Sequence, residues 1–157
     1  MAVSYTHLDV YKRQPYFMPA FFVAMALSGA VAFAQTVKVG VINTYTGPLA
    51  AAGDQMERGI NLYMKLHQKD LPPGVAIELV KRDDTGPNPE VAKRLAQELI
   101  TRDKVQLLTG VIWTPNALSI APLVTEAKVP LIIMNAGTAM ITTKSPYICL
   151  LYTSRCV

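Results

Sequence analysis

The sequence predicts an α/β fold with three αβα layers, in which helices cover both faces of a parallel β-sheet. Two observations support this prediction. Short runs rich in Val, Ile and Leu, the composition of buried parallel strands, occur at residues 36–42, 75–81, 105–109 and 130–134. Longer segments with apolar residues at helical spacing separate these runs. A βαβαβαβ order at this spacing requires parallel strands joined by right-handed crossovers.

The first predicted strand, 36–42, is followed by a loop with Gly and Pro residues over 43–53. A helix that ends near Lys69 comes next, because large side chains recur there at helical spacing and the following Pro-Pro-Gly stops it. The recurring positions are Met56, Ile60, Tyr63 and His67.

The second predicted strand, 75–81, leads through a turn to a second helix. Asn88 is the expected cap of this helix and Pro89 its first residue. Its apolar face carries Val91, Leu95 and Leu99.

A third strand at 105–109, a third helix at 115–128 and a fourth strand at 130–134 complete the predicted order. Pro122 lies inside the third helix. An interior proline removes a backbone hydrogen bond, so we expect a bend or a late start of this helix.

Both ends of the chain resemble translated sequencing adapter rather than natural protein. Residues 2–14 back-translate to two head-to-head copies of the transposon mosaic end used in tagmentation libraries. Residues 149–157 back-translate to the same junction in another frame, with a stop codon next. We therefore expect adapter-derived scars at 1–14 and 149–157, and a natural reading frame that continues beyond Ile148.

Composition and motifs exclude several function classes. Without the two scars the formal charge falls from +4 to +2 and both cysteines, Cys149 and Cys156, are lost, so neither a disulfide nor a Cys-containing metal site is expected. The small net charge, without a basic stripe, disfavours nucleic acid as a partner. The glycines at 47–53 lack dinucleotide and P-loop spacing, and no G-x-S-x-G is present. We predict no cofactor and no enzymatic activity.

An apolar segment precedes the first strand. Residues 17–34 of this segment carry no charge. The segment ends with Ala32 and Ala34, the small residues of a signal peptidase site. Its apolar core is shorter than the roughly 20 residues that span a bilayer. The sequence therefore predicts a signal peptide at 15–34, cleaved after Ala34, in preference to a membrane anchor. Gln35 stands where a lipid-anchored protein has Cys, so we expect a soluble periplasmic product.

Ligands of open parallel sheets bind beyond the carboxyl ends of the strands. After the third predicted strand, Trp113 and Thr114 directly precede a helix, whose N-terminal N–H groups and partial positive charge suit a carboxylate. The small residues at 135–139, after the fourth strand, let a ligand approach the backbone closely. Tyr45, after the first strand, is a further aromatic candidate.

These candidates have structural alternatives. Thr114 and Thr138 are equally explained as helix caps or turn residues. For Trp113 and Tyr45, a core position is a more common role than a wall of a ligand site. None of these assignments is decided by the sequence pattern.

Two other features favour a structural role. The Asp83–Asp84 pair favours turn and capping chemistry over a metal site, and we predict no metal. His67, on a helix without a partner nearby in sequence, favours a surface position over catalysis.

Several short motifs are spread over the predicted lobe. They are Val39-Gly40-Val41-Ile42, Thr46-Gly47-Pro48-Leu49, Gly53-Asp54-Gln55, Gly59-Ile60, Asp83-Asp84-Thr85, Thr109-Gly110 and Val129-Pro130-Leu131-Ile132. Together with the signal peptide they resemble the N-terminal lobe of the branched-chain amino-acid-type substrate-binding proteins of ABC transporters. The resemblance implies one lobe of a type I periplasmic-binding-protein fold at 35–148, truncated before a second lobe.

The resemblance also implies a function. Members capture an amino acid or related small carboxylate in a cleft between two lobes and deliver it to an ABC permease in the inner membrane. A hydroxyl residue after the third strand and N–H groups of the loop after the fourth hold the carboxylate. These positions fall on Thr114 and on Ala136, Gly137 and Thr138.

This chain departs from the pattern of amino-acid binders. Amino-acid binders often have Ser in the loop where this chain has Trp113-Thr114-Pro115. This difference argues against a simple leucine-like ligand and allows an aromatic acid, an amide or another carboxylate. One lobe holds half the cleft, so we expect little binding by this chain alone. The alternatives are a ligand-sensing domain of a receptor or regulator with the same fold, and an enzyme of flavodoxin-like architecture.

Overall fold

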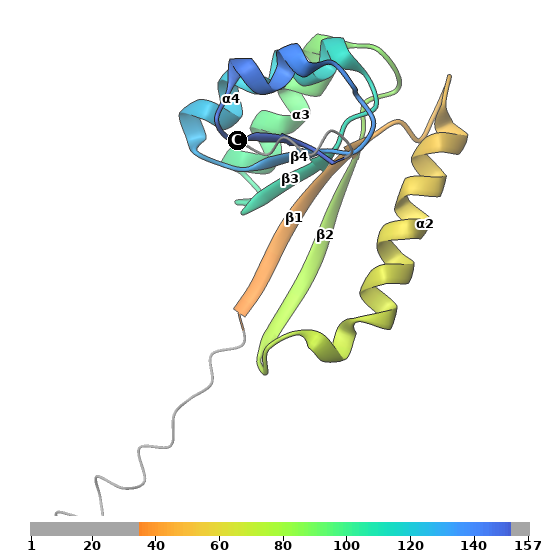
Figure 1. Cartoon of the computed structure of the whole chain (residues 1–157), viewed down its shortest axis with the longest axis vertical. Coiled ribbons are helices and arrows are strands. Elements are labelled where there is room, and N and C mark those ends of the chain that lie inside the picture. Colours follow the sequence, from red (N-terminus) through yellow and green to blue (C-terminus); the bar gives the residue numbers. More distant parts are fainter. Residues whose placement is uncertain (1–34, 152–157) are drawn as a thin grey trace, which may run out of the picture. The chain divides into compact units, whose positions relative to one another are not determined.

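The computed structural model describes residues 35–151. The strands are β1 (Gln35–Asn43), β2 (Val75–Asp83), β3 (Leu107–Gly110), β4 (Leu131–Ile133) and β5 (Ile148–Leu150). The helices are α2 (Ala50–Leu66), α3 (Pro89–Thr101) and α4 (Thr114–Ala127), with short 3-10 helices η1 (Gln68–Asp70) and η2 (Ala139–Lys144). All neighbouring strands are parallel, in the order β2-β1-β3-β4-β5 (Figure 1). The predicted parallel α/β class is confirmed.

Three expected segments lie outside the described residues. They are the scar at 1–14, the signal peptide at 15–34 and the end of the second scar at 152–157. Among residues 35–151, no helix is both long enough and apolar enough to cross a membrane.

β5 is one strand more than the sequence predicts. Ile148 pairs with Leu131 of β4, and Ile148 and Leu150 are buried. Cys149 and Leu150 belong to the segment 149–157, which resembles translated adapter. Cys149 is also disulfide-bonded in the structure, contrary to the expectation of no disulfide.

Helices α3 and α4 pack together and form the hydrophobic core with the sheet. Each contributes an apolar face with an i, i+3, i+4 pattern, as an amphipathic helix requires. The buried side chains are Leu95 and Leu99 of α3, Ile120 and Val124 of α4, and Ile42, Leu108, Leu131 and Ile133 of the strands. Asn88 caps α3 as predicted, because its side chain accepts from Val91 N–H at 3.2 Å.

Helix α4 begins at Thr114 and runs without interruption through Pro122. The late start that Pro122 suggested is therefore not observed. Pro122 itself is exposed, so its ring faces solvent rather than the packed core.

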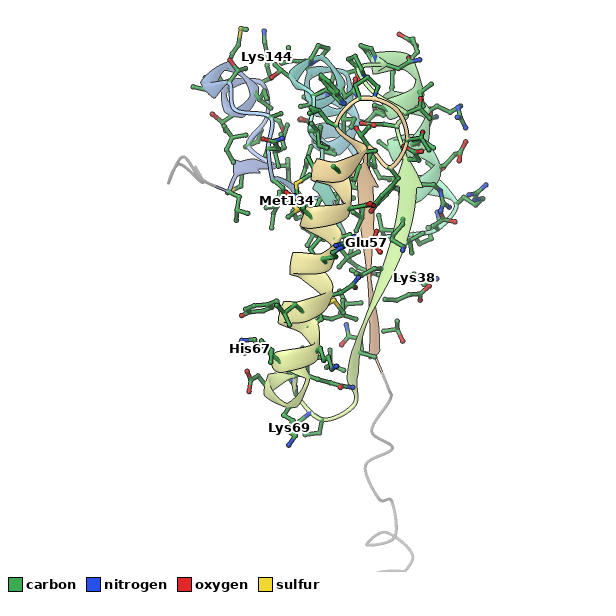
Figure 2. All side chains as sticks on the ribbon, turned by 90° about the vertical axis from the view of Figure 1, so that its right-hand side faces the viewer. Lys38, Glu57, His67, Lys69, Met134 and Lys144 are labelled. Carbon is green, nitrogen blue, oxygen red and sulfur yellow. The ribbon has the colours of Figure 1, made fainter. Side chains whose placement is uncertain are left out.

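Helix α2 lies on the opposite side of β1 and β2 from α3 and α4 (Figures 1 and 2). It begins at Ala50, earlier than predicted, and Gly53 is its buried residue. A Cβ atom at Gly53 would lie 1.9 Å from the Thr44 carbonyl oxygen, so only glycine allows the first turn to approach β1 this closely. By contrast, Leu62 and Leu66 are 59% and 69% exposed.

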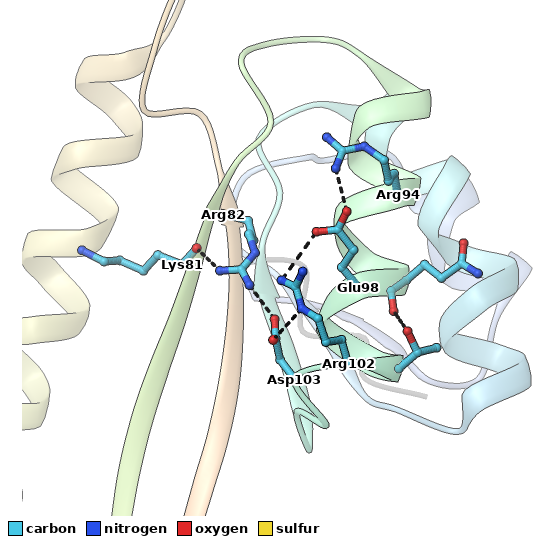
Figure 3. A network of polar contacts seen from close by, with 8 residues as sticks. Lys81, Arg82, Arg94, Glu98, Arg102 and Asp103 are labelled. Atoms are coloured by element: carbon cyan, nitrogen blue, oxygen red, sulfur yellow. Dashed lines mark hydrogen bonds and ion pairs between the residues drawn. The ribbon is translucent and has the colours of Figure 1, made fainter.

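A surface network of ion pairs joins β2 to α3 (Figure 3). Arg82 of β2 pairs with Asp103, which also contacts Arg102, and Glu98 contacts both Arg94 and Arg102. Exposed ion pairs each contribute about 0–1 kcal/mol. The network therefore adds less to stability than the apolar core does.

Candidate functional site

The loops that follow β1, β3 and β4 meet at the carboxyl edge of the sheet. Val111 N–H donates to the Ile42 carbonyl at 2.8 Å, and Met134 N–H donates to the Gly110 carbonyl at 2.8 Å. Parallel strands all end at the same edge, which is where open α/β sheets bind ligands. This edge is the candidate site.

A buried polar network joins the loops after β1, β2 and β3. The Thr44 hydroxyl donates to Asp84 Oδ1 at 2.6 Å and accepts from Trp113 Nε1 at 2.9 Å. The Asn116 side-chain amide donates to Asp84 Oδ2 at 2.8 Å, and Gly86 N–H donates to Asp84 Oδ1 at 3.2 Å. Thr44, Asp84 and Asn116 are fully buried. The Asp84 carboxylate therefore depends on these donors in place of water.

The register of the sheet brings this network together. β1 and β2 pair with Asn43 opposite Asp83, so Thr44 and Asp84 are the first residues beyond the two strands. Asp84 N–H donates to the Asn43 carbonyl at 3.0 Å and continues the pairing by one residue. Asn116 reaches the carboxylate because it lies in the first turn of α4.

Asp83 forms the turn chemistry that the sequence predicts for the Asp83–Asp84 pair. Its Oδ1 accepts from Tyr45 N–H and Thr85 N–H, both at 2.9 Å, and its Oδ2 accepts from the Thr46 hydroxyl at 2.7 Å. Burial acts to raise the pKa of this carboxyl, but the bonds from Thr46, Tyr45 and Thr85 outweigh it. The pKa of Asp83 therefore lies below its usual range. Within residues 35–151, no group of three His, Cys, Asp or Glu residues could hold a metal ion.

We expect the fold to lose stability in acid partly through Asp83. Because folding lowers its pKa, its contribution is complete above the unfolded-state value of about 4 and is lost as pH falls toward the lower folded-state pKa. Glu57, whose pKa is lowered chiefly by its hydrogen bond with Lys81, acts in the same direction. Asp83→Asn should flatten the decline in unfolding free energy below about pH 5, measured by urea denaturation across pH. Thr46→Val should flatten it less, and an unchanged decline in Asp83→Asn contradicts the assignment.

Trp113 and Thr114 lie at the start of α4. Trp113 is the N-cap residue and Thr114 the first helical residue, so Thr114 is not the helix cap that one alternative proposed. Both are half-buried. Pro115 has no N–H, and the N–H groups of Thr114 and Asn116 have no partner within the helix. A hydroxyl, two N–H donors and an aromatic ring therefore come together here.

Tyr45 lies on the side of the edge that faces α2. Its half-buried side chain lines a cavity of about 250 Å³ together with Glu57 and Lys81. Burial, and next the negative charge of Glu57, raise the pKa of the Tyr45 hydroxyl. Tyr45 is therefore a neutral aromatic residue at neutral pH.

Ala136, Gly137 and Thr138 form the loop between β4 and η2. Ala136 is buried, and its N–H donates to the Val111 carbonyl at 3.2 Å, which joins this loop to the loop after β3. Gly137 is exposed and Thr138 half-buried. Thr138 occupies the N-cap position of η2 without a side-chain cap bond. The structure thus brings this loop beside the segment that leads into Trp113 and Thr114.

A groove of about 530 Å³ lies elsewhere, between α2 and the amino end of β2. Tyr63, His67 and Val75 are among its lining residues. Figure 2 shows His67 well away from Met134, which directly follows β4 at the carboxyl edge. His67 is exposed and its ring stacks on Tyr63 with 4.2 Å between centroids, in agreement with a surface position. The groove is at the wrong edge of the sheet for the ligand of a parallel α/β fold.

Sequence reasoning missed part of the site. The sequence pattern does not point to Thr44 or Asn116 as site residues, and for Asp84 it favours only a role in the turn. A polar residue directly after each of two neighbouring strands was the available signal for Thr44 and Asp84. No sequence pattern indicates that Asn116 is buried.

Comparison with known proteins places the chain in a family. Residues 36–155 match the periplasmic binding protein family. The chain belongs to this family. Its relatives include the Leu/Ile/Val-binding protein homolog 6 of Brucella abortus (strain 2308), which is 40% identical over 123 residues. The family's members serve ABC transporters as solute-binding proteins rather than enzymes, and they act in the periplasm.

Solved structures of periplasmic binding proteins are similar to this chain. A solute-binding protein of an ABC transporter from Rhodopseudomonas palustris, in complex with 4-hydroxybenzoate, is 47% identical with a TM-score of 0.70. A second one, from Rhodopseudomonas palustris BisB5 in complex with 3,4-dihydroxybenzoic acid, is 50% identical with a TM-score of 0.69. A branched-chain amino acid transporter substrate-binding protein from Streptococcus pneumoniae, in complex with isoleucine, is 26% identical with a TM-score of 0.67.

The chain corresponds to part of each of these proteins. The Brucella match covers 78% of this chain and 31% of the relative. The match to the 4-hydroxybenzoate complex covers 74% of this chain and 31% of that chain, and the BisB5 match covers 73% and 31%. The match to the isoleucine complex covers 74% and 33%. The described lobe therefore spans about a third of its relatives' length.

Proposed function

We propose that the full-length protein is the periplasmic solute-binding component of an ABC importer. It captures a small carboxylate in a cleft between two lobes and delivers it to a permease in the inner membrane. The signal peptide at 15–34, cleaved after Ala34, exports it. Closure of the lobes is a hinge motion, and the ligand favours closure because it binds the closed state more tightly.

The ligand class that we propose is an aromatic carboxylate of the hydroxybenzoate type. The observation that carries this choice is the difference in identity, 47–50% to the hydroxybenzoate complexes and 26% to the isoleucine complex. Trp113 supports it, because an indole face offers a ring a favourable stacking surface. An aliphatic amino acid would leave that surface without a partner ring.

The residues of the carboxyl edge have distinct proposed roles. The Thr114 hydroxyl and the N–H groups of the first turn of α4 bind the carboxylate, which the partial positive charge of the helix end stabilises. Gly137 and Thr138 offer further N–H groups from the loop after β4. The Ala136 N–H already donates to Val111, so Ala136 shapes the loop instead. Trp113 and Tyr45 supply aromatic walls.

Isothermal titration of the full-length protein tests this function. We expect micromolar or tighter binding of 4-hydroxybenzoate and affinity for leucine about 100-fold lower. Thr114→Val should weaken 4-hydroxybenzoate binding about tenfold, because a hydrogen bond to a charged group is lost. Thr101→Val, at the exposed far end of α3, is the matched control and should leave affinity unchanged. Tighter binding of leucine, or no binding of either compound, would overturn the proposal.

A further inference from the structure

Trp113 is held by the polar network from two directions. Its indole Nε1 donates to the Thr44 hydroxyl, which in turn donates to Asp84 Oδ1. The other oxygen of the same carboxylate accepts from Asn116, three residues further along α4. One buried carboxylate thus fixes both the ring of Trp113 and the helix turn that carries it.

We propose that Thr44 is a positioning residue, whose hydroxyl, held by Asp84, fixes the indole of Trp113 in the orientation that contacts the ligand. This inference rests on the proposed function, since it assumes that a solute binds against Trp113. Thr44 itself does not contact the ligand, because it is fully buried. It acts through the indole.

The geometry leaves the indole little freedom. The Thr44 hydroxyl has one proton, which it gives to Asp84 at 2.6 Å, so its lone pairs face the indole N–H at 2.9 Å. A carboxylate acceptor polarises the hydroxyl and strengthens the second bond. Gly53 packs against the Thr44 carbonyl, so the Thr44 backbone is held as well. A ring fixed before binding costs less entropy when the ligand arrives.

The single tryptophan of the chain makes the orientation measurable without a ligand. In the 157-residue chain, Trp113 gives the only indole N–H signal in a proton–nitrogen NMR spectrum. Thr44→Val preserves the side-chain shape but removes the hydroxyl, and we expect indole N–H exchange with solvent to become about tenfold faster. Thr44→Ser keeps the hydroxyl, so its indole N–H should exchange at the same rate as in the unchanged chain. Thr125→Val is the structural control, because it also removes two hydrogen bonds but at the opposite end of α4.

The ligand arm uses the full-length protein. Thr44→Val should weaken 4-hydroxybenzoate binding about tenfold, whereas Thr44→Ser and Thr125→Val stay within about twofold. Trp113→Phe removes the donor of the same hydrogen bond, so it provides a second test if Thr44→Val fails to fold. Trp113→Phe should weaken 4-hydroxybenzoate binding at least as much as Thr44→Val does. The double variant Thr44→Val/Trp113→Phe should bind no more weakly than Trp113→Phe alone.

Each outcome decides the inference. Faster indole exchange with weaker binding in Thr44→Val supports it. Unchanged exchange, unchanged affinity, full affinity in Trp113→Phe, or additive losses in the double variant would overturn it. Failure of the unchanged protein to bind 4-hydroxybenzoate counts against the proposed function alone, and the exchange measurement then decides whether Thr44 positions the indole.

Discussion

Replacing Gly110 with alanine is expected to lower the free energy of unfolding by about 4 kcal/mol. Gly110 ends β3 with φ +103°, which an L-residue rarely adopts. A Cβ atom there would lie 2.3 Å from the Ile42 carbonyl oxygen and 3.1 Å from its carbonyl carbon. These are backbone atoms in the middle of the sheet, and the same oxygen accepts from Val111 N–H. Neither strand can move aside without losing its pairing.

Gly86→Ala is the matched control for Gly110→Ala. Gly86 also has a positive φ, +129°, but a Cβ atom would meet nothing within 4 Å. Its replacement therefore carries the backbone strain without the collision, and we expect a loss of about 1–2 kcal/mol. Urea denaturation followed by far-UV circular dichroism measures both variants. Equal losses would show that backbone strain alone accounts for the requirement at Gly110.

The turn at Gly110 affects both the stability of the fold and the position of the proposed ligand-binding residues. Gly110 and the following Val111, at φ 60°, both have left-handed backbone conformations. This turn directs the chain from β3 across the end of β1, where Trp113 meets Thr44. A shift at Gly110 therefore displaces the residues that we propose to bind the ligand.

The layout of the fold could be predicted because it depends on local patterns. Each of the first four strands is a short apolar run, and the caps and turns between them have local signals such as Asn88-Pro89. The fifth strand is not predicted, because two of its three residues, Cys149 and Leu150, lie in the segment that resembles translated adapter. The exposure of apolar side chains on α2 also could not be predicted from the sequence pattern. Periodicity places Met56, Ile60 and Tyr63 on a helix but does not say what covers them.

The candidate site could be predicted only in part, because it depends on contacts between distant segments. Trp113 and Thr114 are adjacent in sequence, so a motif could reveal them. The bonds from Thr44 to Asp84 and from Asn116 to Asp84 join residues 40 and 32 positions apart. They follow from the register of β1 with β2 and from the packing of α4, which composition and spacing do not specify.

Leu99→Ala is expected to lower the free energy of unfolding by about 3 kcal/mol. Leu99 is fully buried on α3, in the cluster where α3 and α4 meet the sheet. Truncation to alanine removes apolar contacts and leaves a cavity between packed elements that cannot close fully. The loss should appear as a lower urea midpoint with an unchanged slope, because the surface exposed on unfolding hardly changes.

Leu62→Ala provides the comparison on α2, the helix on the other side of β1 and β2. Leu62 is 59% exposed, so truncation removes little buried surface, and alanine is at least as good a helix former. We expect a change within about 0.5 kcal/mol. The two variants remove the same atoms from helices flanking one sheet, so their difference measures how unequally the two faces are packed. A loss in Leu62→Ala close to that of Leu99→Ala would contradict the exposure of α2 and show that its apolar face is covered in solution.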